Sequence, residues 1–221
     1  MIITCWSPKA GSGTSVVAAT LAGIAARSGR RTLLVDFGGD SAAILGLPTP
    51  ALGLGDVVDG DGGNSPLEFT VKVGDNFDLV APGLRPLPSL QVRRWDRVVG
   101  HLVQASTSGT LVIVDTGCET YPDWLKDVSD RVFLVIRPCY VALRRAVEHH
   151  RSSDPGDGII VVSENDRALT ARDVSLVLNQ PVVAEVPVHH EIARRVDSGL
   201  LNSRIPERLV GALSGIVKDA S

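Results

Sequence analysis

The sequence predicts an α/β fold, with a mostly parallel central sheet covered by helices on both faces. Short, continuous apolar runs recur along the 221-residue chain, and segments with helical periodicity separate them. Strands that are apolar on both faces belong in the interior of a sheet, and consecutive parallel strands need a crossover, usually a helix. One α/β core accommodates a chain of this length, so residues 1–221 are predicted to form a single domain.

The elements follow from the apolar periodicity. The predicted buried strands are residues 1–6, 31–37, 110–114, 131–136, 158–162 and 181–186, and shorter strands are expected at 67–73 and 77–81. The predicted helices are residues 15–28, 89–105, 141–151, 171–178, 191–199 and 206–218, with short helices within 38–46 and near 55–58. Residues 48–66 are rich in Gly, Asp and Pro, so they are predicted to be a surface excursion.

Composition and charge limit the class of protein and the compartment that can be expected. A net charge of −3 does not favour a nucleic-acid binder. Cys5, Cys118 and Cys139 are widely spaced, which excludes a disulfide framework or zinc pattern and predicts buried or half-buried thiols. No charged segment leads into an apolar run at the N-terminus, and no apolar run approaches the ~18 residues that span a bilayer. A cytoplasmic protein without an integral membrane segment is therefore expected.

A loop rich in Gly and Ser joins the first predicted strand to the first predicted helix. Backbone N–H groups at such a junction converge on a point where the helix dipole also favours an anion. Gly11 and Gly13 let the backbone approach that anion closely, and Ser15 is of the residue type whose hydroxyl holds Mg²⁺. The predicted nucleotide-binding residues are Lys9, Ala10, Gly11, Ser12, Gly13, Thr14 and Ser15. The alternative is a glycine-rich turn that only caps the helix.

The loop departs from the standard phosphate-binding motif, G-x-x-x-x-G-K-[ST]. Pro8 stands at the first glycine, Gly13 at the second and Thr14 at the lysine. The missing ammonium would contact the β- and γ-phosphates. Because a hydrogen bond to a charged group contributes ~1.5–3 kcal/mol, its loss lowers affinity by roughly 10- to 100-fold. At most a slow ATPase is expected, since Thr14 carries no charge.

Residues 9–15 resemble the deviant Walker A motif, K-G-G-x-G-K-[ST], of the ParA/MinD-type P-loop ATPases. Lys9 matches the signature lysine of that family, which reaches across a nucleotide-sandwich dimer to the partner's phosphates. Ala10 replaces a glycine of the motif, and Thr14 replaces the ordinary P-loop lysine. The resemblance implies a P-loop NTPase-like fold, ATP and Mg²⁺ as ligands, and a homodimer.

The resemblance continues along the chain in order. Residues 33–36 resemble the strand that ends at the first aspartate of the switch I D-x-D segment. The second aspartate would fall on Gly38, and Asp40, two residues later, is the remaining switch I candidate. Residues 111–116 resemble the Walker B strand, which ends here at Asp115.

The predicted Mg²⁺ site consists of Ser15, Asp36 and Asp115, with contacts through water. Both aspartates end buried strands, and ligands of open α/β sheets bind at the carboxyl ends of strands. The alternative for each aspartate is that it merely caps the loop that follows its strand.

The resemblance implies a degenerate ParA/MinD-like protein that positions cellular machinery through nucleotide-linked dimerisation and partner binding. Ser7, Pro8, Lys9 and the altered loop most resemble the CpaE/TadZ-like branch, linked to pilus assembly, and the septum-site-like proteins. One alternative is a nucleotide-free scaffold of the same fold, because three positions of the family's motifs are altered together, at Ala10, Thr14 and Gly38. An ATP-dependent metabolic ligase is disfavoured, because that chemistry needs the P-loop lysine.

The partner predicted from these patterns belongs to a positioning, secretion or pilus system. DNA is a weaker candidate, and four arginines could form a basic surface for it: Arg194, Arg195, Arg204 and Arg208. Three acidic residues interleave with them, namely Glu191, Asp197 and Glu207. A mixed, solvated face is therefore favoured over a DNA-binding face.

Overall fold

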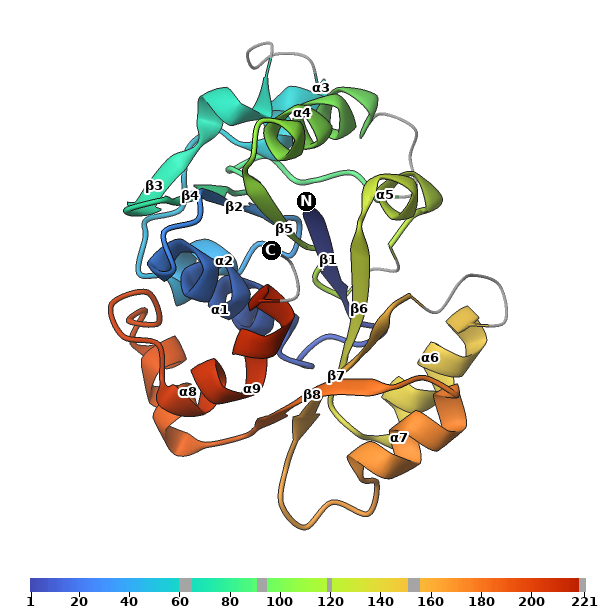
Figure 1. The fold of residues 1–221 in the computed structure, drawn as a ribbon. Helices are drawn as coiled ribbons and strands as arrows, with labels where there is room; N and C mark the ends of the chain where they lie inside the picture. Colours follow the sequence, from blue (N-terminus) through green and yellow to red (C-terminus); the bar gives the residue numbers. More distant parts are fainter. Residues whose placement is uncertain (60–64, 91–94, 119–120, 151–155, 219–221) are drawn as a thin grey trace.

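The computed structural model describes residues 1–59, 65–90, 95–118, 121–150 and 156–218. One eight-stranded sheet runs through the molecule in the order β3-β4-β2-β5-β1-β6-β7-β8 (Figure 1). The strands are β1 Ile2–Trp6, β2 Thr32–Asp36, β3 Val71–Gly74, β4 Phe77–Val80, β5 Leu111–Asp115, β6 Arg131–Ile136, β7 Gly158–Ser163 and β8 Val182–Pro187. Every described pairing is parallel except that of β3 with β4, which confirms the predicted sheet.

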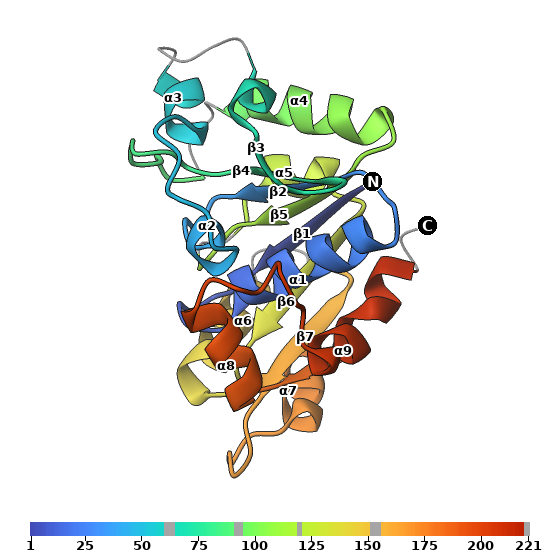
Figure 2. The ribbon, with the colours of Figure 1, turned by 90° about the vertical axis from the view of Figure 1, so that its left-hand side faces the viewer.

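Helices cover both faces of the sheet, as predicted (Figure 1). One layer holds α1 Thr14–Arg27, α2 Ser41–Ile44, α8 His190–Asp197 and α9 Glu207–Lys218, and α1 packs against α9 (Figure 2). The opposite layer holds α3 Leu54–Asp59, α4 Asp96–Thr107, α5 Asp123–Val128, α6 Tyr140–His150 and α7 Ala171–Leu178. Side chains of each central strand alternate between the layers: Leu34 packs toward α1, and Leu33 and Val35 pack toward the other layer.

The central strands are buried along their full length. Every residue of β1, β2 and β5 is buried, which is why these strands are apolar without alternation. The polar exceptions are Thr4, Thr32 and the two aspartates that end β2 and β5, Asp36 and Asp115.

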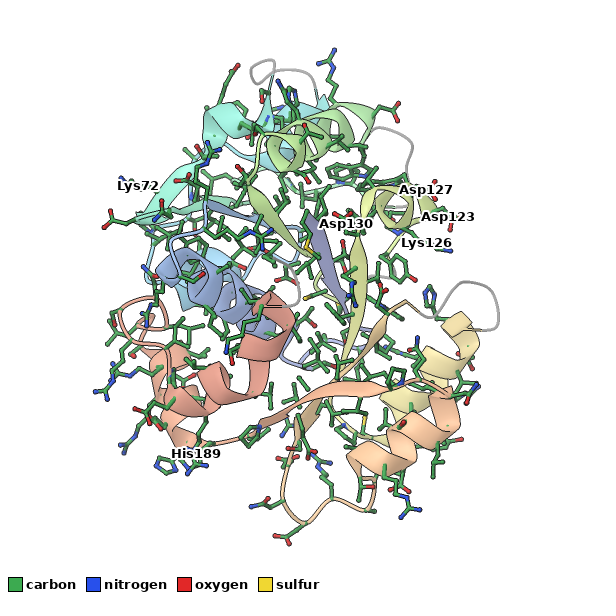
Figure 3. The ribbon with its side chains drawn as sticks, viewed as in Figure 1. Lys72, Asp123, Lys126, Asp127, Asp130 and His189 are labelled. Carbon is green, nitrogen blue, oxygen red and sulfur yellow. The ribbon has the colours of Figure 1, made fainter. Side chains whose placement is uncertain are left out.

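Aspartates also fix the starts of two strands. Asp130 lies beside the start of β1, and its Oδ2 accepts a hydrogen bond from the Ile2 N–H at 2.7 Å (Figure 3). Asp157 does the same for β6, where its Oδ2 accepts from the Val132 N–H at 2.7 Å. These bonds satisfy the N–H group of the first residue of β1 and that of the second residue of β6.

The strand predicted at residues 67–73 is wrong over its first half. A 3₁₀ helix, η1 Pro66–Phe69, precedes β3 there. The Ser65 side chain accepts a hydrogen bond from the Leu67 N–H at 3.1 Å, and Pro66 provides a φ that suits a helical turn. Local capping therefore prevails over the apolar pattern.

Two further boundaries differ from the prediction. The helix predicted at residues 89–105 begins only at Asp96, and residues 91–94 lie outside the described part of the chain. The helix α5 was not predicted, because only six residues separate Pro122 from Ser129 and they show little apolar periodicity. Residue 151, the predicted end of the helix 141–151, also lies outside the described residues.

A contact between two glycines joins α2 to α8 near the carboxyl edge of the sheet. Gly46 and Gly199 follow the two helices with φ of +75° and +64°. A Cβ on Gly46 would lie 2.2 Å from the Gly199 carbonyl oxygen, so the two turns meet backbone to backbone. This contact fixes the spacing of α2 and α8.

Gly46→Ala should destabilise the fold by about 2 kcal/mol or more, because the new Cβ meets rigid backbone at a positive φ. The matched control is Gly211→Ala on α9, where no atom lies within 4 Å of the new Cβ. That change should stabilise the helix by roughly 0.5–1 kcal/mol. Urea unfolding measures both effects, and equal stabilities of the two variants would contradict the glycine contact.

Candidate functional site

The loop between β1 and α1 has the geometry of an anion cradle. Gly11 and Gly13 have φ of +77° and +91°, values that residues with a Cβ rarely adopt. The Ser12 and Ser7 hydroxyls both donate to the Lys9 carbonyl, at 2.7 and 3.0 Å, and so hold the turn. These hydrogen bonds stabilise the turn from which the backbone continues through Gly11 into α1.

The N-terminus of α1 is open. Its first intrahelical hydrogen bond runs from the Val17 N–H to the Gly13 carbonyl at 3.0 Å, and no side chain caps the helix. The N–H groups of Thr14, Ser15 and Val16 precede that bond, and the first turn holds no acidic residue. N–H groups without an intrahelical acceptor and the helix dipole together favour a bound anion at this point.

A cavity of about 500 Å³ lies over this loop. Its lining includes all of the predicted nucleotide-binding residues, Lys9, Ala10, Gly11, Ser12, Gly13, Thr14 and Ser15. Ala43 and Ile44 of α2 and Val196 of α8 add an apolar wall. The volume lies within the range of small-molecule sites, and a polar floor beside an apolar wall is usual for them.

The cavity carries little positive charge. Lys9 is the only Lys or Arg among its described lining residues, whereas Asp40 and Asp197 both line it. The Lys9 Nζ donates to the Ala10 carbonyl at 3.1 Å and so turns back on its own loop. Thr14 is buried at the position of the motif's missing lysine, and its hydroxyl brings no charge.

Asp36 is committed to backbone contacts. The carboxylate is fully buried, with Oδ1 accepting from the Gly39 N–H at 2.8 Å and Oδ2 from the Ser41 N–H at 2.9 Å. Burial raises its pKa, while the N–H groups of Gly39 and Ser41 lower it in part. These contacts match the alternative in which the aspartate caps the loop after its strand.

One of the two carboxylate oxygens of Asp115 accepts a hydrogen bond from a described residue and the other does not. Its Oδ1 accepts from the Gly117 N–H at 2.8 Å, and its Oδ2 is buried with no hydrogen-bond partner among the described residues. Burial, and then the nearby Asp36 carboxylate, raise the pKa of Asp115 to about 7, and the Ser15 hydroxyl lowers it in part. An unpartnered carboxylate oxygen beside a serine hydroxyl is a donor set that suits Mg²⁺, which prefers oxygen ligands.

Two glycines cover the carboxylates. A Cβ on Gly38 would lie 3.4 Å from both Asp36 Oδ1 and Asp115 Oδ2, and 3.1 Å from the Gly117 Cα. A second aspartate of a D-x-D segment at position 38 would therefore press on the Gly117 backbone in this conformation. Asp40 is exposed in the cavity, at the N-cap of α2, with no side-chain cap hydrogen bond.

The sequence prediction for Cys118 was wrong. A half-buried thiol was expected, but Cys118 is exposed and lines the cavity. Gly117, which directly precedes Cys118, has a φ of +66°. The glycine was the available signal, since a positive φ often marks a change of chain direction.

Comparisons with known proteins show the fold. The sequence matches no protein-family model. It also matches no curated protein. Among solved structures, a ParA family ATPase of Chlorobium tepidum superposes with a TM-score of 0.78 at 19% identity, covering 98% of this chain and 98% of that chain.

Two MinD structures are similarly close. The septum site-determining protein MinD of Pyrococcus horikoshii, complexed with Mg-ADP, gives a TM-score of 0.76 at 17% identity and covers 100% of this chain and 95% of that chain. The MinC:MinD cell division protein complex of Aquifex aeolicus gives 0.75 at 20% identity, covering 99% and 93%. The chain therefore has the ParA/MinD-type P-loop ATPase fold. No helix in the described part of the chain has the length and apolarity to cross a membrane.

Asp115→Asn should change how stability depends on pH. The folded pKa of about 7 lies above the unfolded value, ~3.9, so the folded state holds a proton that the unfolded state has lost in that interval. The free energy of unfolding of the unmodified protein should therefore fall as pH rises from about 4 to about 7, by up to ~1.4 kcal/mol per pH unit. The uncharged asparagine should flatten this fall.

Urea unfolding between pH 4 and pH 8 measures this effect. Asp197→Asn is the matched control, because it removes an exposed carboxylate from the same cavity and should keep the original slope. Coinciding slopes for Asp115→Asn and the unmodified protein would contradict the assignment.

Proposed function

We propose that this chain is a ParA/MinD-like nucleotide-binding protein that positions cellular machinery through nucleotide-linked dimerisation, with slow or absent ATP hydrolysis. The observation that carries the proposal is the open N-terminus of α1, beneath a cavity lined by residues 9–15 and beside the unpartnered Oδ2 of Asp115. A phosphate group and a divalent cation are the ligands that this pair of features suits best.

The phosphates would sit on the backbone N–H groups of the loop and of the first turn of α1. Ser15 and Asp115 would hold Mg²⁺, directly or through water. Asp36 would hold the neighbouring loop in place through its hydrogen bonds to backbone N–H groups. When bound, the cation supplies positive charge against the phosphates. It would also favour the ionised form of Asp115, whose pKa is raised in this structure.

Hydrolysis should be slow for two reasons. Thr14 leaves the site without the lysine that neutralises charge developing in phosphoryl transfer. Gly38 removes the second switch I carboxylate, and Asp40, two residues later, is the remaining candidate for orienting water. Binding depends less on these groups, because the backbone N–H groups remain.

The proposed homodimer would use Lys9 across the interface, and the partner would belong to a septum, pilus or secretion system. The fold similarity to MinD in a complex with MinC supports a protein partner. A DNA cargo is less well supported, because Glu191 and Asp197 lie on α8 together with Arg194 and Arg195. The CpaE/TadZ-like resemblance of residues 7–9 favours the pilus among these settings.

A nucleotide-free scaffold is the second candidate. Asp36 is fully engaged with backbone N–H groups, and Gly38 and Gly117 cover both carboxylates. These contacts close the carboxylate end of the site, while the cavity over residues 9–15 stays open. A scaffold would keep them at all nucleotide concentrations, whereas Mg²⁺ binding at Asp115 would be expected to separate the two glycines.

Calorimetry with ATP·Mg²⁺ tests the binding. We expect the unmodified protein to bind, and Thr14→Lys to bind roughly 10- to 100-fold more tightly because it restores a charged contact to the phosphates. Ser15→Ala should bind ATP with little dependence on Mg²⁺. Absence of binding by the unmodified protein at millimolar ATP·Mg²⁺ would remove the nucleotide from the proposal and favour the scaffold.

Alkylation of Cys118 gives an independent test. Its exposed thiol lines the cavity, whereas Cys5 is fully buried and burial raises the pKa of that thiol. N-ethylmaleimide should modify Cys118, and saturating ATP·Mg²⁺ should slow this at least several-fold. Peptide mass spectrometry separates Cys118 from Cys139, which serves as the internal control. An unchanged rate at Cys118 would place the nucleotide elsewhere.

A further inference from the structure

The proposed site is short of positive charge. A nucleoside triphosphate carries several negative charges. Among the described residues that line the cavity, Lys9 is the only Lys or Arg that could balance them. Asp40 and Asp197 line the same cavity, and their negative charges would repel phosphates. Mg²⁺ compensates only in part, so a further cation from outside the cavity would strengthen binding.

Arg145 of α6 lies next to the phosphate loop but outside the cavity. Its Nη1 donates to the Pro8 carbonyl at 3.3 Å, one residue before Lys9. Neither Pro8 nor Arg145 lines the cavity, so the guanidinium contacts the loop outside it. Arg145 is exposed and makes no ion pair with an acidic residue in the described part of the chain.

The neighbouring arginine behaves differently. Arg144 forms an ion pair with Glu148 one turn along α6, with Nε and Oε1 2.9 Å apart. Its charge is balanced within its own helix. Arg145 is therefore the uncompensated cation of the pair, and it is anchored to the segment that carries Lys9.

We propose that Arg145 is a positioning residue of the dimer, and that its guanidinium contacts the phosphates bound by a second copy of this chain. The inference rests on the proposed nucleotide-linked homodimer. Ala10 and Gly11, at the crest of the loop, are exposed, so a second copy can approach this face. Two chains that meet there each present Lys9 and Arg145 to the other's phosphates.

The chemistry suits this role. A guanidinium is charged at all relevant pH values and offers paired N–H donors that match phosphate oxygens. Anchoring one Nη to the Pro8 carbonyl limits the side-chain entropy lost on contact. In a symmetric dimer the contact forms twice, so one substitution removes two charged contacts. The proposed cation would offset part of the charge missing at Thr14.

The test compares Arg145→Ala, Arg145→Lys and the matched control Arg144→Ala. Sedimentation velocity with a non-hydrolysable ATP analogue and Mg²⁺ measures the dimer dissociation constant. A fluorescent nucleotide at a protein concentration below that constant measures binding to the monomer. Circular dichroism checks that each variant is folded, which is expected because both arginines are exposed.

Arg145→Ala should weaken the nucleotide-dependent dimer by roughly tenfold or more while leaving monomer binding unchanged. Arg145→Lys should recover part of the loss, and Arg144→Ala should dimerise normally. Equal dimerisation of Arg145→Ala and the unmodified protein would overturn the role of Arg145 alone. Weaker monomer binding would instead assign Arg145 to its own site. Failure of the unmodified protein to dimerise with the analogue would overturn the dimer itself, and Arg145 with it.

Discussion

The parallel pairing of β2, β5 and β1 is the constraint on which the site depends. Asp36 pairs in register with Asp115, and Asp115 pairs with Cys5 near the end of β1. Parallel strands end at the same edge of a sheet, so this register brings two carboxylates and the loop between β1 and α1 together from three distant parts of the sequence. Because both faces of the three strands are packed, a one-residue shift in register would move every side chain into the opposite layer and disrupt the packing of both layers.

Burial of two carboxylates at this edge has an electrostatic cost that the fold offsets only in part. Asp36 receives two backbone N–H donors, whereas Asp115 receives one and keeps an oxygen without a hydrogen-bond partner in the described part of the chain. The raised pKa of Asp115 is the consequence, since a proton is the available compensation when no cation is bound. A divalent cation would replace that proton, which links the stability of this edge to ligand binding.

Much of this could be read from the sequence, because the signals are local. The apolar runs predicted the buried strands, and the Gly- and Ser-rich segment predicted the loop after β1, in which Gly11 and Gly13 have positive φ. Contacts between distant segments could not be predicted in the same way. Three contacts join residues whose proximity depends on the completed fold. They are the close approaches of Gly38 to Gly117 and of Gly46 to Gly199, and the hydrogen bond from Arg145 to Pro8. The 3₁₀ turn at Pro66 was missed for a different reason, since its serine cap competes with an apolar pattern that favours a strand.

If the proposed site is correct, phosphate binds at the start of α1 and Asp115 faces the accompanying cation. A crystal structure determined with ATP·Mg²⁺ decides this. We expect phosphate oxygens within hydrogen-bond distance of the N–H groups of residues 13–15, Mg²⁺ between Ser15 and Oδ2 of Asp115, and Gly38 moved away from Gly117. A loop without phosphate at saturating ATP·Mg²⁺, with Gly38 still against Gly117, would contradict it.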